Sequence, residues 1–256
     1  MILRLFILSI FFFHGCSTIE QSRLTNSEKF EIGLQYFEKQ KYQKSKEYFE
    51  DIVQNEQGTN LGLESTFLLA KTLFELKEFD EASYNFNYFS MFSKDIDNVE
   101  FSQFMKSKCA FESTLPYNKD QTSTLYAISI IQEFLDNFPY SKFKDDAYDM
   151  IIKLRTRLAR KNFESARLYL KMKKYNSAFY YFDIIISEFY DTKYHDEALI
   201  YYIFTHIVMD DYKMAKSYYE NIKSNFNNNL KRIEAEQVLE DFRNGLGLSG
   251  LYKLYK

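Results

Sequence analysis

Side chains that act as nucleophiles or metal ligands are scarce in this sequence. It contains 2 Cys, 3 His and 7 Gly among 256 residues. His195 and His206 have no Cys and no HExxH-type partner that would help to bind a metal ion or activate a nucleophile. So few glycines also leave no Gly-rich loop to hold a phosphate. The sequence therefore predicts no enzyme activity, no metal and no cofactor, and we expect His195 to be a loop residue beside the fifth helical hairpin.

Cys16 is the side chain whose position indicates a chemical modification. Residues 1–15 carry one Arg followed by an apolar run, which is typical of a signal peptide and too short to span a bilayer. Gly15 and Cys16 end this segment as in a lipobox, where the cysteine is lipidated and becomes the mature N-terminus. Residues 16–26 would then be the lipidated cysteine and its tether. The alternative is an ordinary secretory signal in which Cys16 has no role.

The remaining thiol and the overall charge exclude several classes of protein. Lipidation of Cys16 leaves Cys109 alone, so no disulfide framework is expected. Cys109 lies in an apolar helical pattern, which favours a small buried hydrophobe. The net charge of −3 is too near balance to predict binding to nucleic acid or to a charged membrane surface by bulk attraction.

Small and large apolar residues recur at fixed spacings within residues 162–190. Ala166 and Ala178 lie in two successive helical patterns, and Phe182 follows Ala178 by one turn. A small residue on each partner lets two antiparallel helices approach closely, and a large residue one turn later fills the groove between them. This pattern is typical of a tetratricopeptide-type helical hairpin.

The same pattern recurs along the chain. The aligned small residues of the second helices are Ser45, Ala82, Ala127, Ala178 and Ala215, and the large residues four positions later are Phe49, Phe86, Ile131, Phe182 and Tyr219. The third repeat is interrupted by a loop at residues 115–119, so that Ala110 is the small residue of its first helix. Together with 7 Gly and 2 Pro, this repetition predicts an all-α solenoid of about five tetratricopeptide-like hairpins.

Breaks in the helical pattern divide the chain. Residues 27–140 would form repeats one to three, residues 141–226 repeats four and five, and residues 227–256 a capping helix and a tail. Because no Gly or Pro occurs from 141 to 171, we expect one long helix to join repeats three and four. Thr25 and Glu28 have the spacing of a capping box, which predicts where the first helix begins.

The C-terminal half also carries longer motifs. These are DQT at 120–122, FPYSKFKDDA at 138–147, LRTRLARKNFESARLYLKMKKYNSA at 154–178 and ISEFYDTKYHDEAL at 186–199. In their order and spacing they resemble the BamD/YfiO family of outer-membrane β-barrel assembly lipoproteins. The motifs cover about a third of the chain, and residues 17–100 resemble the family mainly in repeat geometry. Tyr190 departs from the family's repeat, which usually has Pro there.

The resemblance implies a non-enzymatic subunit that a lipid anchor holds at the periplasmic face of the outer membrane. It implies that the C-terminal repeats bind a POTRA domain of the barrel protein BamA, and that the N-terminal repeats receive unfolded outer-membrane β-barrel proteins. The alternative is another periplasmic tetratricopeptide-repeat lipoprotein, which scaffolds cell-wall or division proteins. Binding to nucleic acid is not expected of an exported protein.

The repeat register predicts which side chains would line the substrate groove. Six residues on the first helices of repeats one and two share this position: Phe30, Leu34, Phe37, Phe67, Lys71 and Phe74. An apolar groove with one cation suits an extended chain that has aromatic side chains and a terminal carboxylate. The alternative is that these residues belong to the core, because helical periodicity does not separate groove from core.

A basic stripe runs along the predicted long helix. Arg157, Lys161, Arg167 and Lys171 recur at helical spacing on one face. They would form a docking face for an acidic POTRA surface or for lipid head groups. The alternative is a solvated helix face whose long side chains cover apolar surface.

Overall fold

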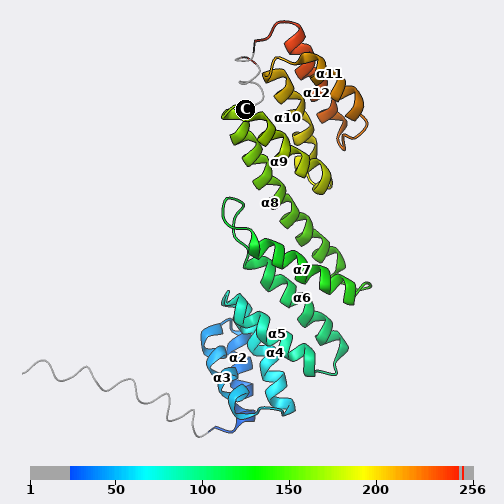
Figure 1. Cartoon of the computed structure of the whole chain (residues 1–256). Helices are drawn as coiled ribbons and strands as arrows, with labels where there is room; N and C mark the ends of the chain where they lie inside the picture. The colour runs from blue at the N-terminus through cyan, green and yellow to red at the C-terminus, as the bar shows by residue number, and fades with distance from the viewer. Residues whose placement is uncertain (1–23, 248–249, 251–256) are drawn as a thin grey trace, which may run out of the picture. The chain divides into compact units, whose positions relative to one another are not determined.

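The computed structural model describes residues 24–247 and residue 250, and every regular element in that part of the chain is an α-helix. Within residues 26–112 and within residues 144–243, consecutive helices pack on one another, as helical hairpins require (Figure 1). The predicted all-α, hairpin-repeat fold is therefore confirmed. The chain divides into two compact units: the N-terminal unit of residues 1–113 and 129–143, and the C-terminal unit of residues 114–128 and 144–256.

The N-terminal unit is built from two complete hairpins and a fifth helix that packs against them. Its helices are α2 (Asn26–Glu38), α3 (Tyr42–Asn55), α4 (Asn60–Glu75), α5 (Phe79–Phe92) and α6 (Ile96–Glu112). The predicted capping box begins α2, since the Thr25 N–H donates to Glu28 Oε2 at 2.8 Å and the Glu28 N–H donates to Thr25 Oγ1 at 3.3 Å. Both groups would otherwise be unpaired at the helix end.

The repeat register predicted from small and large residues is confirmed in the core. All five small residues and all five large residues of the second helices are buried. In the first hairpin the fit is close, because a Cβ on Gly33 would lie 3.0 Å from Phe49 Cε1. Ser45 replaces the usual alanine, and its hydroxyl donates to the Gly33 carbonyl at 3.0 Å. A buried hydroxyl without such an acceptor would be destabilising.

One turn conformation joins the helices of repeats one, two, four and five. A residue in the left-handed region, with φ between 55° and 63°, follows the first helix at Gln40, Lys77, Lys173 and Asp210. In the fourth hairpin the Lys173 N–H donates to the Leu170 carbonyl at 3.0 Å, and the Lys174 N–H donates to the Tyr169 carbonyl at 2.9 Å. This Schellman arrangement satisfies carbonyls at the helix end. It is built here without glycine, at a conformational cost of roughly 1–2 kcal/mol per turn.

The third repeat contains the predicted insertion. Ala110 is buried near the end of α6, and Leu115 lies exposed in the connection to α7 (Thr122–Asn137). The first half of α7 belongs to the C-terminal unit and its second half to the N-terminal unit. The longer connection is therefore a feature of the repeat at which the two units divide.

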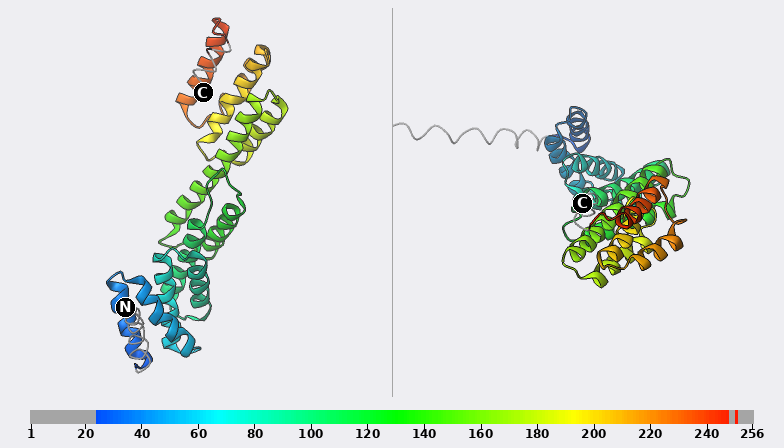
Figure 2. Two further views of the ribbon diagram at one scale, coloured as in Figure 1. Left: turned by 90° about the vertical axis from the view of Figure 1, so that its left-hand side faces the viewer. Right: turned by 90° about the horizontal axis from the view of Figure 1, so that it is seen from above.

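The C-terminal unit contains the long helix and the cap. Its helices are α8 (Lys144–Lys171), α9 (Tyr175–Glu188), α10 (Tyr194–Val208), α11 (Tyr212–Ile222) and α12 (Asn229–Arg243). The predicted long helix is α8, which begins three residues later than expected and pairs with α9 (Figure 2). The cap helix α12 packs on α10 and α11.

The expectation that His195 is a loop residue is wrong. It is buried in the first turn of α10, where its Nδ1 lies 2.9 Å from Asp196 Oδ1. Asp196 is also buried, and its two oxygens accept the backbone N–H groups of Asn227 and Asn228 at 3.0 and 2.8 Å. These residues precede α12 directly. The pair is thus part of a polar network that holds the cap helix in place, which helical spacing alone does not reveal.

Candidate functional site

The six predicted groove residues lie on α2 and α4 of the N-terminal unit. All six are half-buried rather than fully buried or fully exposed. Four of them pack edge-on against a ring of the second helix in their own hairpin: Phe30 on Phe49, Phe37 on Tyr42, Phe67 on Phe86 and Phe74 on Phe79. Each side chain thus contributes to the core and retains exposed area.

Two lysines lie over these aromatic rings. Lys71 Nζ is 5.2 Å from the centroid of Phe37 and 5.5 Å from that of Phe67. Lys108 Nζ, from α6, is 5.3 Å from the centroid of Phe74. A cation at this distance is attracted by the negative face of the ring. Lys108 was not predicted, because it does not occupy the position in its repeat that Lys71 occupies in repeat two.

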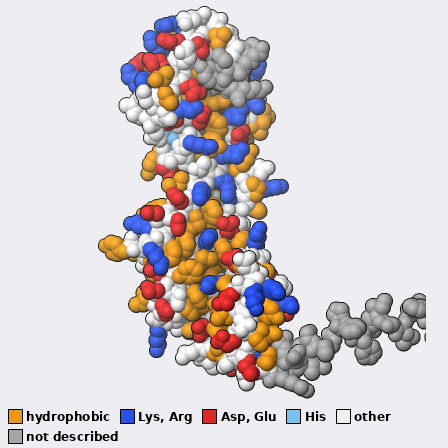
Figure 3. Space-filling model, turned by 180° about the vertical axis from the view of Figure 1, so that it is seen from behind, with side chains coloured by type: hydrophobic (Ala, Val, Ile, Leu, Met, Phe, Trp, Pro, Cys, Tyr) orange, Lys and Arg blue, Asp and Glu red, His pale blue; other side chains and the backbone are white. Residues whose placement is uncertain are grey.

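Three lysines of the same unit, Lys29, Lys46 and Lys106, lie close to carboxylates. Lys29 Nζ lies 2.6 Å from Asp51 Oδ2, and Lys46 Nζ lies 2.5 Å from Glu78 Oε2. The hydrogen bond to Glu78 raises the pKa of Lys46. The N-terminal unit presents hydrophobic side chains with cations among them (Figure 3). Among the described residues, Lys71 and Lys108 have no carboxylate partner.

The basic residues of α8 contact a loop of their own unit. Arg157 Nη1 donates to Thr114 Oγ1 and, at 3.0 Å, to the Leu115 carbonyl. Lys161 Nζ donates to the Lys119 carbonyl at 3.0 Å. Half of the predicted stripe thus holds the inserted loop of repeat three against α8.

The other two cations of the stripe differ from each other, since Arg167 lies 5.9 Å from the ring centroids of Phe163 and Tyr201. Arg167 Nη1 lies 3.3 Å from Glu164 Oε2 on the same helix. Lys171 is exposed and has no hydrogen bond or ion pair to another side chain in the described part of the chain. A docking role for the four residues remains a prediction, with Lys161 and Lys171 as the most exposed cations.

The model of the YfiO family, described as outer membrane lipoprotein, matches residues 22–230, which is well over half of the sequence. The chain belongs to the YfiO family. The YfiO family resemblance inferred from the motifs is therefore confirmed, and the chain is a non-enzymatic outer membrane lipoprotein.

Two proteins similar to this chain are both named outer membrane protein assembly factor BamD. The outer membrane protein assembly factor BamD of Rickettsia prowazekii (strain Madrid E) is 25% identical over 214 residues, which cover 83% of this chain and 84% of the relative. The BamD of Caulobacter vibrioides (strain ATCC 19089 / CIP 103742 / CB 15) is 25% identical over 149 residues, which cover 58% of this chain and 48% of the relative.

Two further findings concern membrane spans and metal sites in the described part of the chain. No helix among residues 24–247 combines the length and the apolar character needed to cross a bilayer. The same residues contain no cluster of His, Cys, Asp and Glu side chains suited to a metal ion. Cys16 lies outside the described residues.

Proposed function

We propose that this protein is the lipid-anchored subunit of an outer-membrane β-barrel assembly machinery that receives unfolded barrel proteins on its N-terminal unit. The observation that carries the proposal is the set of half-exposed Phe rings with Lys71 and Lys108 above them. The names of the relatives supply the biological setting. The anchor would be a lipid on Cys16, at the periplasmic face of the membrane.

The chemistry of the groove suits one kind of ligand. Barrel strands alternate apolar and polar residues and carry aromatic residues near the membrane interfaces. The exposed ring areas of Phe37, Phe67 and Phe74 would contact such side chains. Lys71 and Lys108, which have no carboxylate partner among the described residues, would pair with the terminal carboxylate of the strand.

A peptide-binding experiment tests the groove. The ligand is a fluorescent peptide with alternating aromatic residues and a free C-terminal carboxylate, and it is compared with the same peptide ending in an amide. The wild-type protein should bind the carboxylate form about tenfold more tightly, because a hydrogen bond to a charged group contributes roughly 1.5–3 kcal/mol and this site is partly exposed. Lys71→Met with Lys108→Met should lose that preference.

A matched control keeps the groove test specific. Lys44 Nζ lies 5.4 Å from the Tyr36 ring centroid, outside the predicted groove. Lys44→Met removes an equivalent cation over a ring and should leave the preference intact. Equal affinity of the wild-type protein for both peptides would rule out carboxylate recognition at this site.

The lipid anchor is tested separately. Cys16→Ser should abolish fatty-acid labelling and release the protein from membranes, or leave it held by an uncleaved signal. Normal processing with lipid incorporation in this variant would exclude Cys16 as the modified residue.

We assign the docking of BamA to the C-terminal unit. Lys161 and Lys171 would steer an acidic POTRA surface toward α8, and such rim charges contribute only about 0–1 kcal/mol each. Reversing both to Glu should slow association with purified BamA periplasmic domains, most strongly at low salt. Reversal of the exposed Lys213 and Lys216 on α11 makes the same change in charge and should have a smaller effect.

The outcome for BamA separates the two candidate functions. Failure of the tagged wild-type protein to retain BamA would favour a scaffold for cell-wall or division proteins instead. If the Lys161/Lys171 variant and the Lys213/Lys216 variant associate at equal rates, the basic residues of α8 serve fold stability and not docking.

A further inference from the structure

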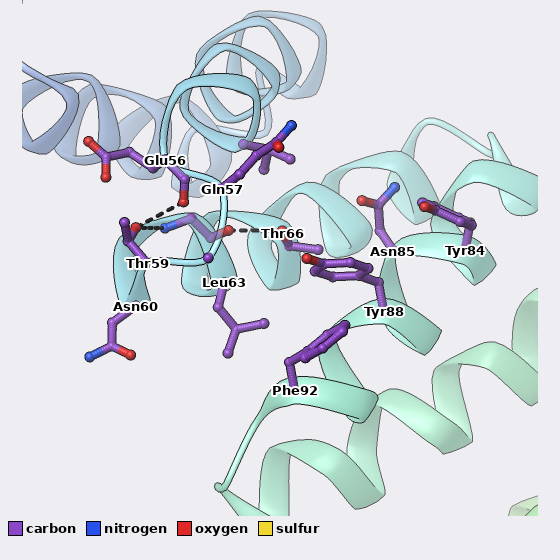
Figure 4. Close-up of a pocket in the computed structure, with 13 residues that line it drawn as sticks. Glu56, Gln57, Thr59, Asn60, Leu63, Thr66, Tyr84, Asn85, Tyr88 and Phe92 are labelled. Atoms are coloured by element: carbon purple, nitrogen blue, oxygen red, sulfur yellow. Dashed lines mark hydrogen bonds between the residues drawn. The ribbon is translucent and has the colours of Figure 1, made fainter.

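The N-terminal unit carries a hollow beside the point where the described chain begins. Asn26 Nδ2 donates to Glu56 Oε1 at 2.6 Å, which ties the start of α2 to the end of α3. Glu56 lines a hollow of about 510 Å³, together with the α3–α4 turn (Figure 4). The described part of the chain therefore begins next to this hollow.

The opposite wall of the hollow is an exposed apolar stripe on α5. Tyr84, Tyr88 and Phe92 lie one turn apart on this wall, as Figure 4 shows. Met91 follows Tyr88 by three residues and so lies on the same side of α5, and Ile96 begins α6 four residues after Phe92. The exposed fractions are 69% for Tyr84, 37% for Tyr88, 67% for Met91, 57% for Phe92 and 76% for Ile96. Single exposed apolar residues are ordinary, but a continuous set marks a contact with another molecule or with a membrane.

The stripe runs to the edge of the unit at which the described chain begins. Because each hairpin is antiparallel, the starts of α2, α4 and α6 and the ends of α3 and α5 lie at one edge (Figure 1). The segment from Cys16 to Leu24 spans at most about 30 Å when fully extended. A lipid on Cys16 would thus keep this edge within reach of the membrane surface, where Tyr side chains are favoured.

We propose that Tyr84, Tyr88, Met91, Phe92 and Ile96 form a lipid-facing edge that rests on the membrane in which Cys16 is anchored. The inference depends on the proposed anchor at Cys16, and it adds a second contact that would orient the N-terminal unit on the bilayer. The turn within the edge carries Lys94 and Asp95, and Asp97 follows in the first turn of α6. Asp95 caps α6 by accepting the Asn98 N–H at 3.1 Å. Since that turn has no positive excess, the contact is apolar and should persist at high salt.

The absence of tryptophan from the sequence makes a direct test available. Phe92→Trp places a single fluorophore in the lipid-facing edge, and Asp80→Trp places the same fluorophore at the exposed first turn of α5. Each full-length, lipidated variant is reconstituted in phosphatidylethanolamine–phosphatidylglycerol vesicles with brominated acyl chains. The Phe92→Trp emission should shift to shorter wavelength and lose about half its intensity, in low and high salt alike, whereas Asp80→Trp should not change.

A second substitution shows whether the quenching depends on the edge. Met91→Asp with Ile96→Asp, added to Phe92→Trp, should abolish the quenching while circular dichroism shows an unchanged helix content. An acylated, vesicle-bound Phe92→Trp protein with unquenched emission would overturn the lipid contact and leave the anchor intact. A protein without an acyl group would overturn both. A blue shift that requires an added barrel-protein peptide and no lipid would assign the edge to polypeptide instead.

Discussion

Phe182→Ala should destabilise the C-terminal unit by about 3–5 kcal/mol, the usual cost of deleting a buried aromatic ring. Phe182 is fully buried, and its ring centroid lies 6.1 Å from those of Phe163 and Tyr201. Ala166 and Ala178 beside it are also fully buried and have no long side chains that could fill the cavity. The value should therefore lie in the upper part of this range.

The loss of stability should lower the thermal midpoint of unfolding by a measurable amount. In a protein of this size, 1 kcal/mol lowers the thermal midpoint by about 2–4 °C, so a decrease of roughly 6–20 °C is expected. Tyr180→Ala is the matched control on the same helix. Its side chain is 62% exposed, and its removal should change stability by less than about 0.5 kcal/mol.

The assay is thermal unfolding followed by circular dichroism, together with amide hydrogen exchange. Faster exchange in Phe182→Ala should appear in α8, α9 and α10, whose side chains surround the ring. Equal midpoints for Phe182→Ala and Tyr180→Ala would show that the ring of Phe182 is not buried in the hairpin core.

Three further predictions concern the turns, the cap and the buried thiol. Lys173→Gly should raise the thermal midpoint by relieving a left-handed residue, whereas Lys174→Gly, at φ −93°, should lower it; equal shifts would contradict the turn geometry. Asp196→Asn should lower the free energy of unfolding by about 1–3 kcal/mol and speed amide hydrogen exchange in α12, because one oxygen that accepts a backbone N–H is lost. Unchanged exchange would show that Asp196 does not hold α12 in place. Burial raises the pKa of Cys109 to about 12, so at pH 8 iodoacetamide should label this thiol in Cys16→Ser protein far more slowly than an unfolded control. Since the folded pKa lies above the unfolded value of about 8.5, Cys109 should also lower the free energy of unfolding as pH rises from about 8.5 toward 12. Fast labelling of the native protein would contradict the burial of Cys109.

Much of the fold could be predicted from the sequence because helical hairpins are local structures. The spacing of Ala166, Ala178 and Phe182 is determined by helix geometry and by one short turn, so the register needs no distant information. The Thr25–Glu28 capping box and the shift to Ala110 in repeat three are equally local. The family motifs identified the YfiO relationship from contiguous residues.

Other features were decided only by contacts between residues far apart in the sequence. Helical spacing placed Arg157 and Lys161 on one face of a helix, but the carbonyl groups that they contact come from a loop 42 positions earlier. Lys108 joins the candidate groove because α6 brings it over the ring of Phe74 on α4. Asp196 accepts hydrogen bonds from residues 31 and 32 positions later, a contact that no local pattern in the sequence indicates. Periodicity determines which side of a helix a residue occupies, whereas only the packing of helices determines what lies opposite it.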